Sequence, residues 1–135
     1  MRAFDLPEPG DFVYCRFPHT GLPGPGPKLR PALVLQVGDI DGEPFVRVAY
    51  GTSQKTDRLH AGELLMSGED GAAYALSGLA YPTKFDLGRV VELPYNDIWF
   101  GVPPRAPFGQ TPKLGVLHPN LMRRAKAAFV AARRG

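Results

Sequence analysis

The stretch Arg30-Pro31-Ala32-Leu33-Val34-Leu35-Gln36-Val37 is the part of the chain around which the rest is organised. Apolar residues occupy both alternating sets of its positions, a pattern typical of a strand that is buried on both faces. Pro31 has no N–H, which suits the first residue of a strand but not its middle. We therefore expect Arg30 to lie where a loop joins the sheet, held by the strand and reachable from solvent.

A second strand is expected over Pro44 to Tyr50, and the acidic segment from Gly38 to Glu43 predicts a turn between the two strands. Together they form an antiparallel hairpin. Antiparallel neighbours of matched length begin and end at the same level, so the segment from Gly51 to Gln54 should return to the start of the first strand. The sequence thus predicts that Thr52 lies close to Arg30.

Further elements are expected on both sides of this hairpin. Strand-like composition is found in Phe12 to Phe17, Tyr74 to Leu76, Thr83 to Leu87 and Gly88 to Pro94, the last two joined at a glycine bend. Leu59 and Leu64 to Met66 indicate a strand or a short turn.

The C-terminal segment has a helical pattern instead. Leu121, Met122, Ala125, Phe129 and Ala132 recur at helical spacing after Pro119, which is a good first-turn residue. Short strands followed by one terminal helix predict a mainly β fold, a small and strongly bent antiparallel barrel.

Length and composition predict one domain over residues 1–135. No apolar run resembles a signal peptide or a membrane-spanning helix, and the single cysteine, Cys15, fits a reducing compartment, so we expect a cytoplasmic protein. The formal charge is +3, but five of the 16 basic residues follow Pro119. The remainder holds 11 basic and 13 acidic residues, which argues against a surface that coats DNA.

The common catalytic signatures are absent from the sequence. The three histidines are scattered, no spacing of His, Cys or carboxylates indicates a metal site, and there is no nucleophile elbow or phosphate-binding loop. What remains is a cation and a hydroxyl, Arg30 with Thr52 or Ser53. This pair suits RNA cleavage, because the substrate's own 2′-hydroxyl attacks the phosphate and neither a metal nor a cofactor is required. A guanidinium would stabilise the phosphate oxygens as charge develops on them.

Several segments of the N-terminal half resemble a known protein family. Gly10-Asp11-Phe12-Val13, the glycine-containing loop that follows, Arg30 to Leu35 and Thr52-Ser53-Gln54 are similar to the MazF/PemK toxins of type II toxin–antitoxin systems. The resemblance implies an SH3-like antiparallel barrel of the MazF/PemK/CcdB type with a C-terminal α-helix, acting as a homodimer. It implies a metal-independent endoribonuclease toxin that cleaves single-stranded RNA and leaves a 2′,3′-cyclic phosphate. It also implies a cognate antitoxin as partner.

By position, the resemblance makes Arg30 the catalytic arginine and Thr52 the catalytic hydroxyl residue, with Ser53 and Gln54 beside the scissile phosphate. Charge and placement add Lys28 and Lys84 as candidates for RNA phosphate contacts.

The first loop departs from the family pattern. Many relatives have an acidic residue before the arginine, where this chain has Pro25-Gly26-Pro27-Lys28-Leu29. The general base is therefore open, and His19 in the same loop is a candidate, because imidazole exchanges protons near neutral pH. An ordinary exposed loop histidine is the competing interpretation.

Two other functions are compatible with the same barrel. One is a non-catalytic SH3-like binding module that has lost cleavage, which the altered first loop favours. The other is a gyrase poison of the CcdB type, which ranks last because the terminus from Ala131 to Gly135 has no bulky end group. Tyr95, Trp99 and Phe100 are candidates for stacking on RNA bases, or for filling the barrel interior.

Overall fold

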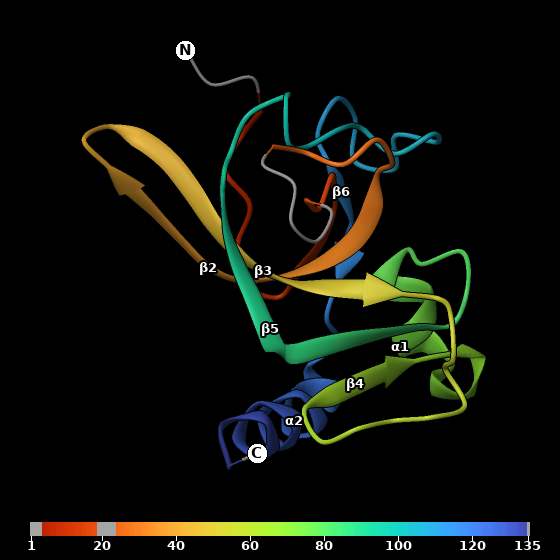
Figure 1. Ribbon diagram of the computed structural model, residues 1–135. Coiled ribbons are helices and arrows are strands. Elements are labelled where there is room, and N and C mark those ends of the chain that lie inside the picture. Colours follow the sequence, from red (N-terminus) through yellow and green to blue (C-terminus); the bar gives the residue numbers. More distant parts are fainter. Residues whose placement is uncertain (1–3, 19–23, 135) are drawn as a thin grey trace.

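The computed structural model describes residues 4–18 and 24–134, without the side chain of residue 134 (Figure 1). The strands are β1 (Asp11–Cys15), β2 (Arg30–Ile40), β3 (Glu43–Thr52), β4 (Glu63–Met66), β5 (Thr83–Pro94) and β6 (Lys113–Val116). The helical elements are η1 (Gly68–Asp70), α1 (Ala72–Ser77), η2 (Pro119–Leu121) and α2 (Met122–Arg134).

The six strands form one sheet in the order β4-β5-β3-β2-β1-β6, and every neighbouring pair is antiparallel. The sheet curls strongly, and α2 packs beneath β4 and β5 (Figure 1). The predicted mainly β architecture with a C-terminal helix is confirmed.

The central hairpin of β2 and β3 is longer than predicted. The expected turn from Gly38 to Glu43 is largely strand, and only Asp41 and Gly42 remain between the paired residues Ile40 and Glu43. Their φ angles are 54° and 85°, as a two-residue hairpin turn requires. The hairpin therefore projects from the sheet as an arm (Figure 1).

Strand β5 combines the two predicted pieces and bends between them. Ala49 of β3 pairs with Val90, whereas Gly51 pairs with Phe85, so several residues of β5 lie outside the ladder at this point. The expected bend near Gly88 coincides with this break in register, and it lets one long strand run along two parts of the curled sheet (Figure 1).

The predicted strand from Tyr74 to Leu76 is wrong, because this segment lies in helix α1. Gly71 and Gly78 bound the helix, and Gly78 has the left-handed conformation (φ 73°) that commonly ends one. Ala73 and Ser77, four residues apart, are its buried positions. Three residues were too short a window to reveal this helical spacing.

Both faces of β2 contribute to the interior, as its sequence pattern predicts. Leu33 packs with Phe12 and Phe85 in a first core cluster, and Ala32 and Val34 pack in a second cluster on the other face. All three β2 residues are at most 1% exposed. The strand that begins at Arg30 is therefore anchored on both sides.

The C-terminal helix is present, and its predicted buried face is confirmed for Leu121 and Ala125 but not for Met122 and Phe129. Ala125 and Ala128 are buried, whereas Met122 and Phe129 are about 40% exposed. The helix lies so close to the sheet that a Cβ on Gly62 would be 2.7 Å from the Cβ of Ala132. Small side chains fit this close approach and large ones do not. No helix in the described part of the chain is long and apolar enough to cross a bilayer.

Candidate active site

Arg30 is held at the first position of β2 by its neighbours on β1. It pairs with the buried Cys15, and Pro31 pairs with Tyr14. The backbone N–H of Tyr14 donates to Pro112, away from β2, so the missing N–H of Pro31 leaves no acceptor unsatisfied there. The backbone at Arg30 is thereby fixed while its side chain is half-buried.

The β2–β3 register brings the end of β3 to the same level. Ala32 pairs with Tyr50, and a Cβ on Gly51 would lie 2.8 Å from the carbonyl oxygen of Pro31. Continued by two residues, this register sets Arg30 opposite Thr52. Residues directly opposite in an antiparallel pair have Cα atoms about 4.5–5.5 Å apart and side chains on the same face. The backbone thus has the arrangement on which the predicted pair depends.

The functional groups of this pair are available within the described structure. The Arg30 side chain forms no hydrogen bond or ion pair with any described residue. Thr52 Oγ1 accepts a hydrogen bond from the N–H of Gln54 at 3.2 Å, which leaves the hydroxyl proton able to donate elsewhere. Ser53 and Gln54 are exposed beside it. A permanent cation and a hydroxyl donor therefore lie on neighbouring strand ends.

Two aromatic rings accompany this pair, and the sequence reasoning missed them. Phe17 and Tyr50 meet edge to face with their ring centroids 4.7 Å apart, and both are half-buried. Tyr50 lies two residues before Thr52, so it shares the face of Thr52. That alternation was the signal that could have identified it.

The aromatic residues that the sequence offered for base stacking are used differently. Tyr95 is 4% and Phe100 1% exposed, and their rings meet in the second core cluster at 5.0 Å. Trp99 is half-buried against the same cluster. The alternative interpretation, that they fill the interior, is confirmed for Tyr95 and Phe100.

The three remaining candidates, Lys28, Lys84 and His19, differ in their surroundings. Lys28 is exposed and forms no ion pair with a described residue, so its charge is available to a ligand. Lys84 pairs with Thr52 in the ladder, but its ammonium group is buried: it donates to the carbonyl of Arg58 at 2.8 Å and forms an ion pair with Glu63 at 3.3 Å. Lys84 therefore contributes to the fold rather than to an exposed phosphate site. His19 lies outside the described residues.

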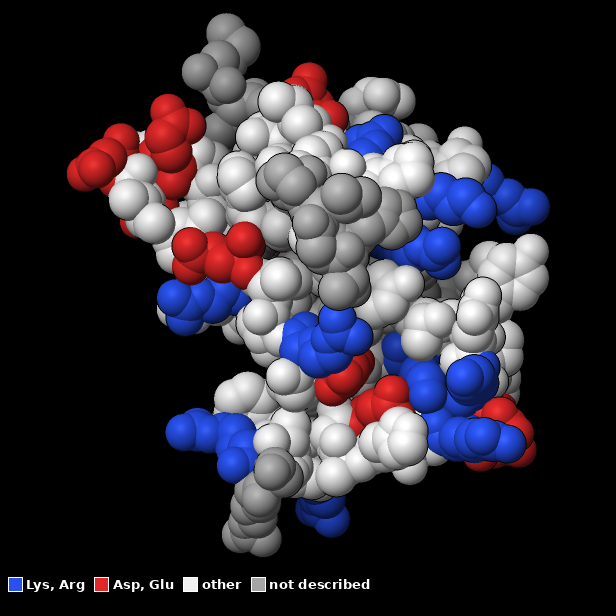
Figure 2. Space-filling model, in the orientation of Figure 1, with Lys and Arg blue, Asp and Glu red and all other residues white. Residues whose placement is uncertain are grey.

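Charges are unevenly distributed over the visible surface (Figure 2). Acidic side chains gather at the end of the β2–β3 arm, whereas lysines and arginines are spread over the middle and the opposite side of this face. The strand ends at Arg30 and Thr52 are remote from the acidic end, because they lie at the other end of the same two strands.

Cys15 is excluded as a nucleophile by its surroundings. It is fully buried in the second core cluster, and burial raises the pKa of its thiol far above the ordinary value. The reactive thiolate therefore does not form at neutral pH. Among the described residues, no three His, Cys, Asp or Glu side chains converge into a group that could hold a metal.

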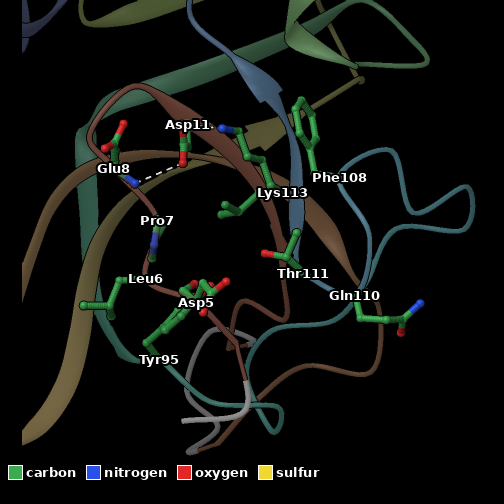
Figure 3. Close-up of a pocket in the computed structure, with 11 residues that line it drawn as sticks. Asp5, Leu6, Pro7, Glu8, Asp11, Tyr95, Phe108, Gln110, Thr111 and Lys113 are labelled. Carbon is green, nitrogen blue, oxygen red and sulfur yellow. Dashed lines mark hydrogen bonds and ion pairs between the residues drawn. The ribbon is translucent and has the colours of Figure 1, made fainter.

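A pocket of about 430 Å³ beside β6 is lined by neither Arg30 nor Thr52 (Figure 3). Its buried carboxylate, Asp11, accepts from the N–H of Glu8 at 2.9 Å and lies 3.5 Å from Nζ of Lys113. The same ammonium lies 4.7 Å from the centre of the Phe108 ring. These polar groups join the N-terminal segment to β6, so we interpret them as structural.

Comparison with known proteins supports the fold. No protein-family model matches the sequence, and no curated protein matches it. Among solved structures, an endoribonuclease from a mycobacterial species in complex with its cognate antitoxin is similar, with a TM-score of 0.57 and 14% identity over 96% of each chain. A second mycobacterial endoribonuclease has a TM-score of 0.59 and 13% identity, over 97% of this chain and 94% of the other. At these identities the likeness shows a shared fold.

Proposed function

We propose that this chain is a metal-independent endoribonuclease toxin that cleaves single-stranded RNA at the Arg30–Thr52 strand ends. The observation that carries the proposal is the register of β2 and β3, in which Ala32 pairs with Tyr50. Continued by two residues, it supports a position of Thr52 opposite Arg30, whose side chain has no described partner. The shared fold with two endoribonucleases supports the same activity.

In the proposed reaction, the 2′-hydroxyl oxygen of the RNA attacks the adjacent phosphorus and the bond to the 5′-oxygen breaks. The attacking hydroxyl loses its proton to a base, and the departing 5′-oxygen gains one. The products are a 2′,3′-cyclic phosphate and a 5′-hydroxyl. The guanidinium of Arg30 donates paired hydrogen bonds to the phosphate oxygens, and the hydroxyl of Thr52 donates another.

The base is proposed to come from the first loop, with His19 as the candidate, because no acidic residue stands between Pro25 and Arg30. Lys28, exposed in the same loop, would contact an RNA phosphate. Ser53 and Gln54 would lie beside the scissile nucleotide. We further propose a homodimer regulated by a cognate antitoxin, since one similar endoribonuclease is in complex with its own antitoxin.

The test is cleavage of a long single-stranded RNA in the presence of EDTA, with both new ends mapped. Replacing Arg30 by alanine should lower the cleavage rate by at least about 100-fold, the effect of removing one preorganised donor to a developing oxyanion. Arg30→Lys keeps the charge but loses the paired geometry and should recover little. Arg47→Ala, which removes an exposed arginine paired with Glu92, is the matched control and should cleave normally.

Undiminished cleavage by Arg30→Ala with an intact fold would overturn the site. A binding module without cleavage is the second candidate, favoured by the missing acidic residue in the first loop. In that case the native chain would retard RNA in a gel without producing new ends.

A further inference from the structure

The outer edge of β2 is unpaired along the arm. Strand β1 pairs with β2 from Arg30 to Leu33, and the N–H of Gly10 donates to the carbonyl of Val34 at 2.8 Å. Beyond Val34, no described residue makes a backbone hydrogen bond to this edge, although β2 continues to Ile40. Such an edge can accept an additional strand.

The register determines which backbone groups face this edge. Asp39 pairs with Pro44, which has no N–H and whose carbonyl accepts from the N–H of Tyr95 on the far side, at 3.0 Å. The two residues therefore do not exchange hydrogen bonds, and the backbone groups of Asp39 point away from β3. By alternation those of Val37 do the same. Both residues thus present an N–H and a C=O to an incoming strand.

The face beside this edge is acidic. A pocket of about 940 Å³ is lined by Val37, Asp39 and Glu43 of the arm and by Asp97 of the segment after β5, with no lysine or arginine. The three carboxylates are exposed, and none forms an ion pair with a described residue. In a chain of net charge +3 this is a local reversal of sign, which repels RNA and attracts a cationic ligand.

We propose that the β2 edge from Val37 to Asp39 and the acidic pocket beside it bind an extended, basic peptide segment of a partner protein by strand addition. The segment pairs its backbone with Val37 and Asp39. Its lysine or arginine side chains occur at every second position, so that they point to one face and reach Asp39 and Asp97. Glu43 pairs with Ile40 and so lies on the other face of the hairpin, where its charge adds to the local negative field. This site lies at the end of the hairpin remote from the proposed RNA site, so it binds independently of cleavage.

The probe is a fluorescein-labelled peptide of alternating lysine and valine, titrated with the full chain and followed by anisotropy. Two further peptides are N-methylated, one on the lysine amides and one on the valine amides. In an added strand all lysine amides face one side and all valine amides the other. The peptide that is methylated on the amides facing β2 loses several hydrogen bonds and should bind at least about tenfold more weakly. The peptide that is methylated on the opposite amides should bind like the parent.

Matched protein variants test the carboxylates. The triple change Asp39→Asn, Glu43→Gln and Asp97→Asn should weaken binding of the parent peptide about tenfold, which corresponds to about 1.4 kcal/mol. The control triple, Asp57→Asn, Glu69→Gln and Glu92→Gln, alters the net charge equally elsewhere on the surface and should leave binding unchanged.

The proposal fails if both methylated peptides bind like the parent, if the two triple variants bind alike, or if the parent peptide does not bind. It also fails if the first triple variant loses binding of a labelled RNA oligonucleotide, because the edge would then be part of an RNA surface. Arg30→Ala should bind the peptide normally, so loss of cleavage and loss of peptide binding are separable results.

Discussion

The two ends of the β2–β3 hairpin differ in almost every property that governs binding. At one end, Arg30 and Thr52 lie where the strands are anchored by two core clusters, and they offer a cation and a hydroxyl. At the other end, Asp39 and Glu43 lie on a projecting arm with an unpaired edge. One pair of strands can thus carry two sites of opposite charge, since a ladder about ten residues long separates them.

The largest expected effect concerns the close approach at the anchored end. A Cβ on Gly51 would lie 2.5 Å from Cε1 of Phe85 and 2.8 Å from the Pro31 oxygen, so Gly51→Ala must move the strands apart. We expect a loss of about 1–3 kcal/mol in the free energy of unfolding, measured with denaturant, and slower RNA cleavage.

Gly68→Ala is the matched control for this change, because no atom lies within 4 Å of the added methyl group. It should alter stability by less than about 0.5 kcal/mol. Equal stability of both variants would show that β2 and β3 are not as close at Gly51 as the structure has them.

The next largest effect is a pH dependence of the free energy of unfolding, which is due to Cys15, the residue paired with Arg30 at the anchored end. The folded state raises the pKa of this thiol, so above about pH 8.5 the unfolded chain releases the proton while the folded chain retains it. The free energy of unfolding should therefore fall with rising pH, by at most about 1.4 kcal/mol per pH unit from this group. Cys15→Ala should lack this contribution, and denaturant unfolding of both proteins from pH 7 to 10 measures it; parallel curves would contradict the prediction.

Thr52 should have a smaller effect. Thr52→Val removes the hydroxyl and keeps the shape, so the cleavage rate should fall about tenfold by loss of one hydrogen bond in the transition state. Thr52→Ser keeps the hydroxyl and should retain most of the activity. If valine and serine at this position cleave equally fast, the hydroxyl has no role.

The smallest effect is expected from the arm. The triple change at Asp39, Glu43 and Asp97 should leave RNA cleavage within about twofold of the native rate at physiological salt, because exposed charges beyond a Debye length of about 8 Å are screened. A larger change would mean that the two ends are not independent.

The central hairpin could be predicted because its information is local. Alternating apolar residues identify β2, Pro31 marks its start, and antiparallel pairing then places Thr52 relative to Arg30. The arm is longer than predicted. Asp41-Gly42 is a strong two-residue turn signal, but the acidic residues around it favour a turn over the whole segment from Gly38 to Glu43.

The errors concern residues whose environment depends on distant parts of the chain. Charge and placement make Lys84 a candidate for an RNA phosphate contact, but Glu63 and the carbonyl of Arg58 bind its ammonium group. On α2 the error concerns Met122 and Phe129, which are exposed. The helix lies too close to the backbone of Gly62 for large side chains on its sheet side, where Ala132 fits. Neither contact leaves a periodic signal in the sequence.

Cys15 has a practical consequence for spectroscopy. It is the one cysteine of the chain, and its sulfur is enclosed in the interior, so maleimide reagents will find no target on the native protein. A cysteine introduced at Ile40, which is 57% exposed at the tip of the arm, would accept a single dye or spin label with no background. A label on the arm therefore requires one substitution, at Ile40, and Cys15 can stay in place.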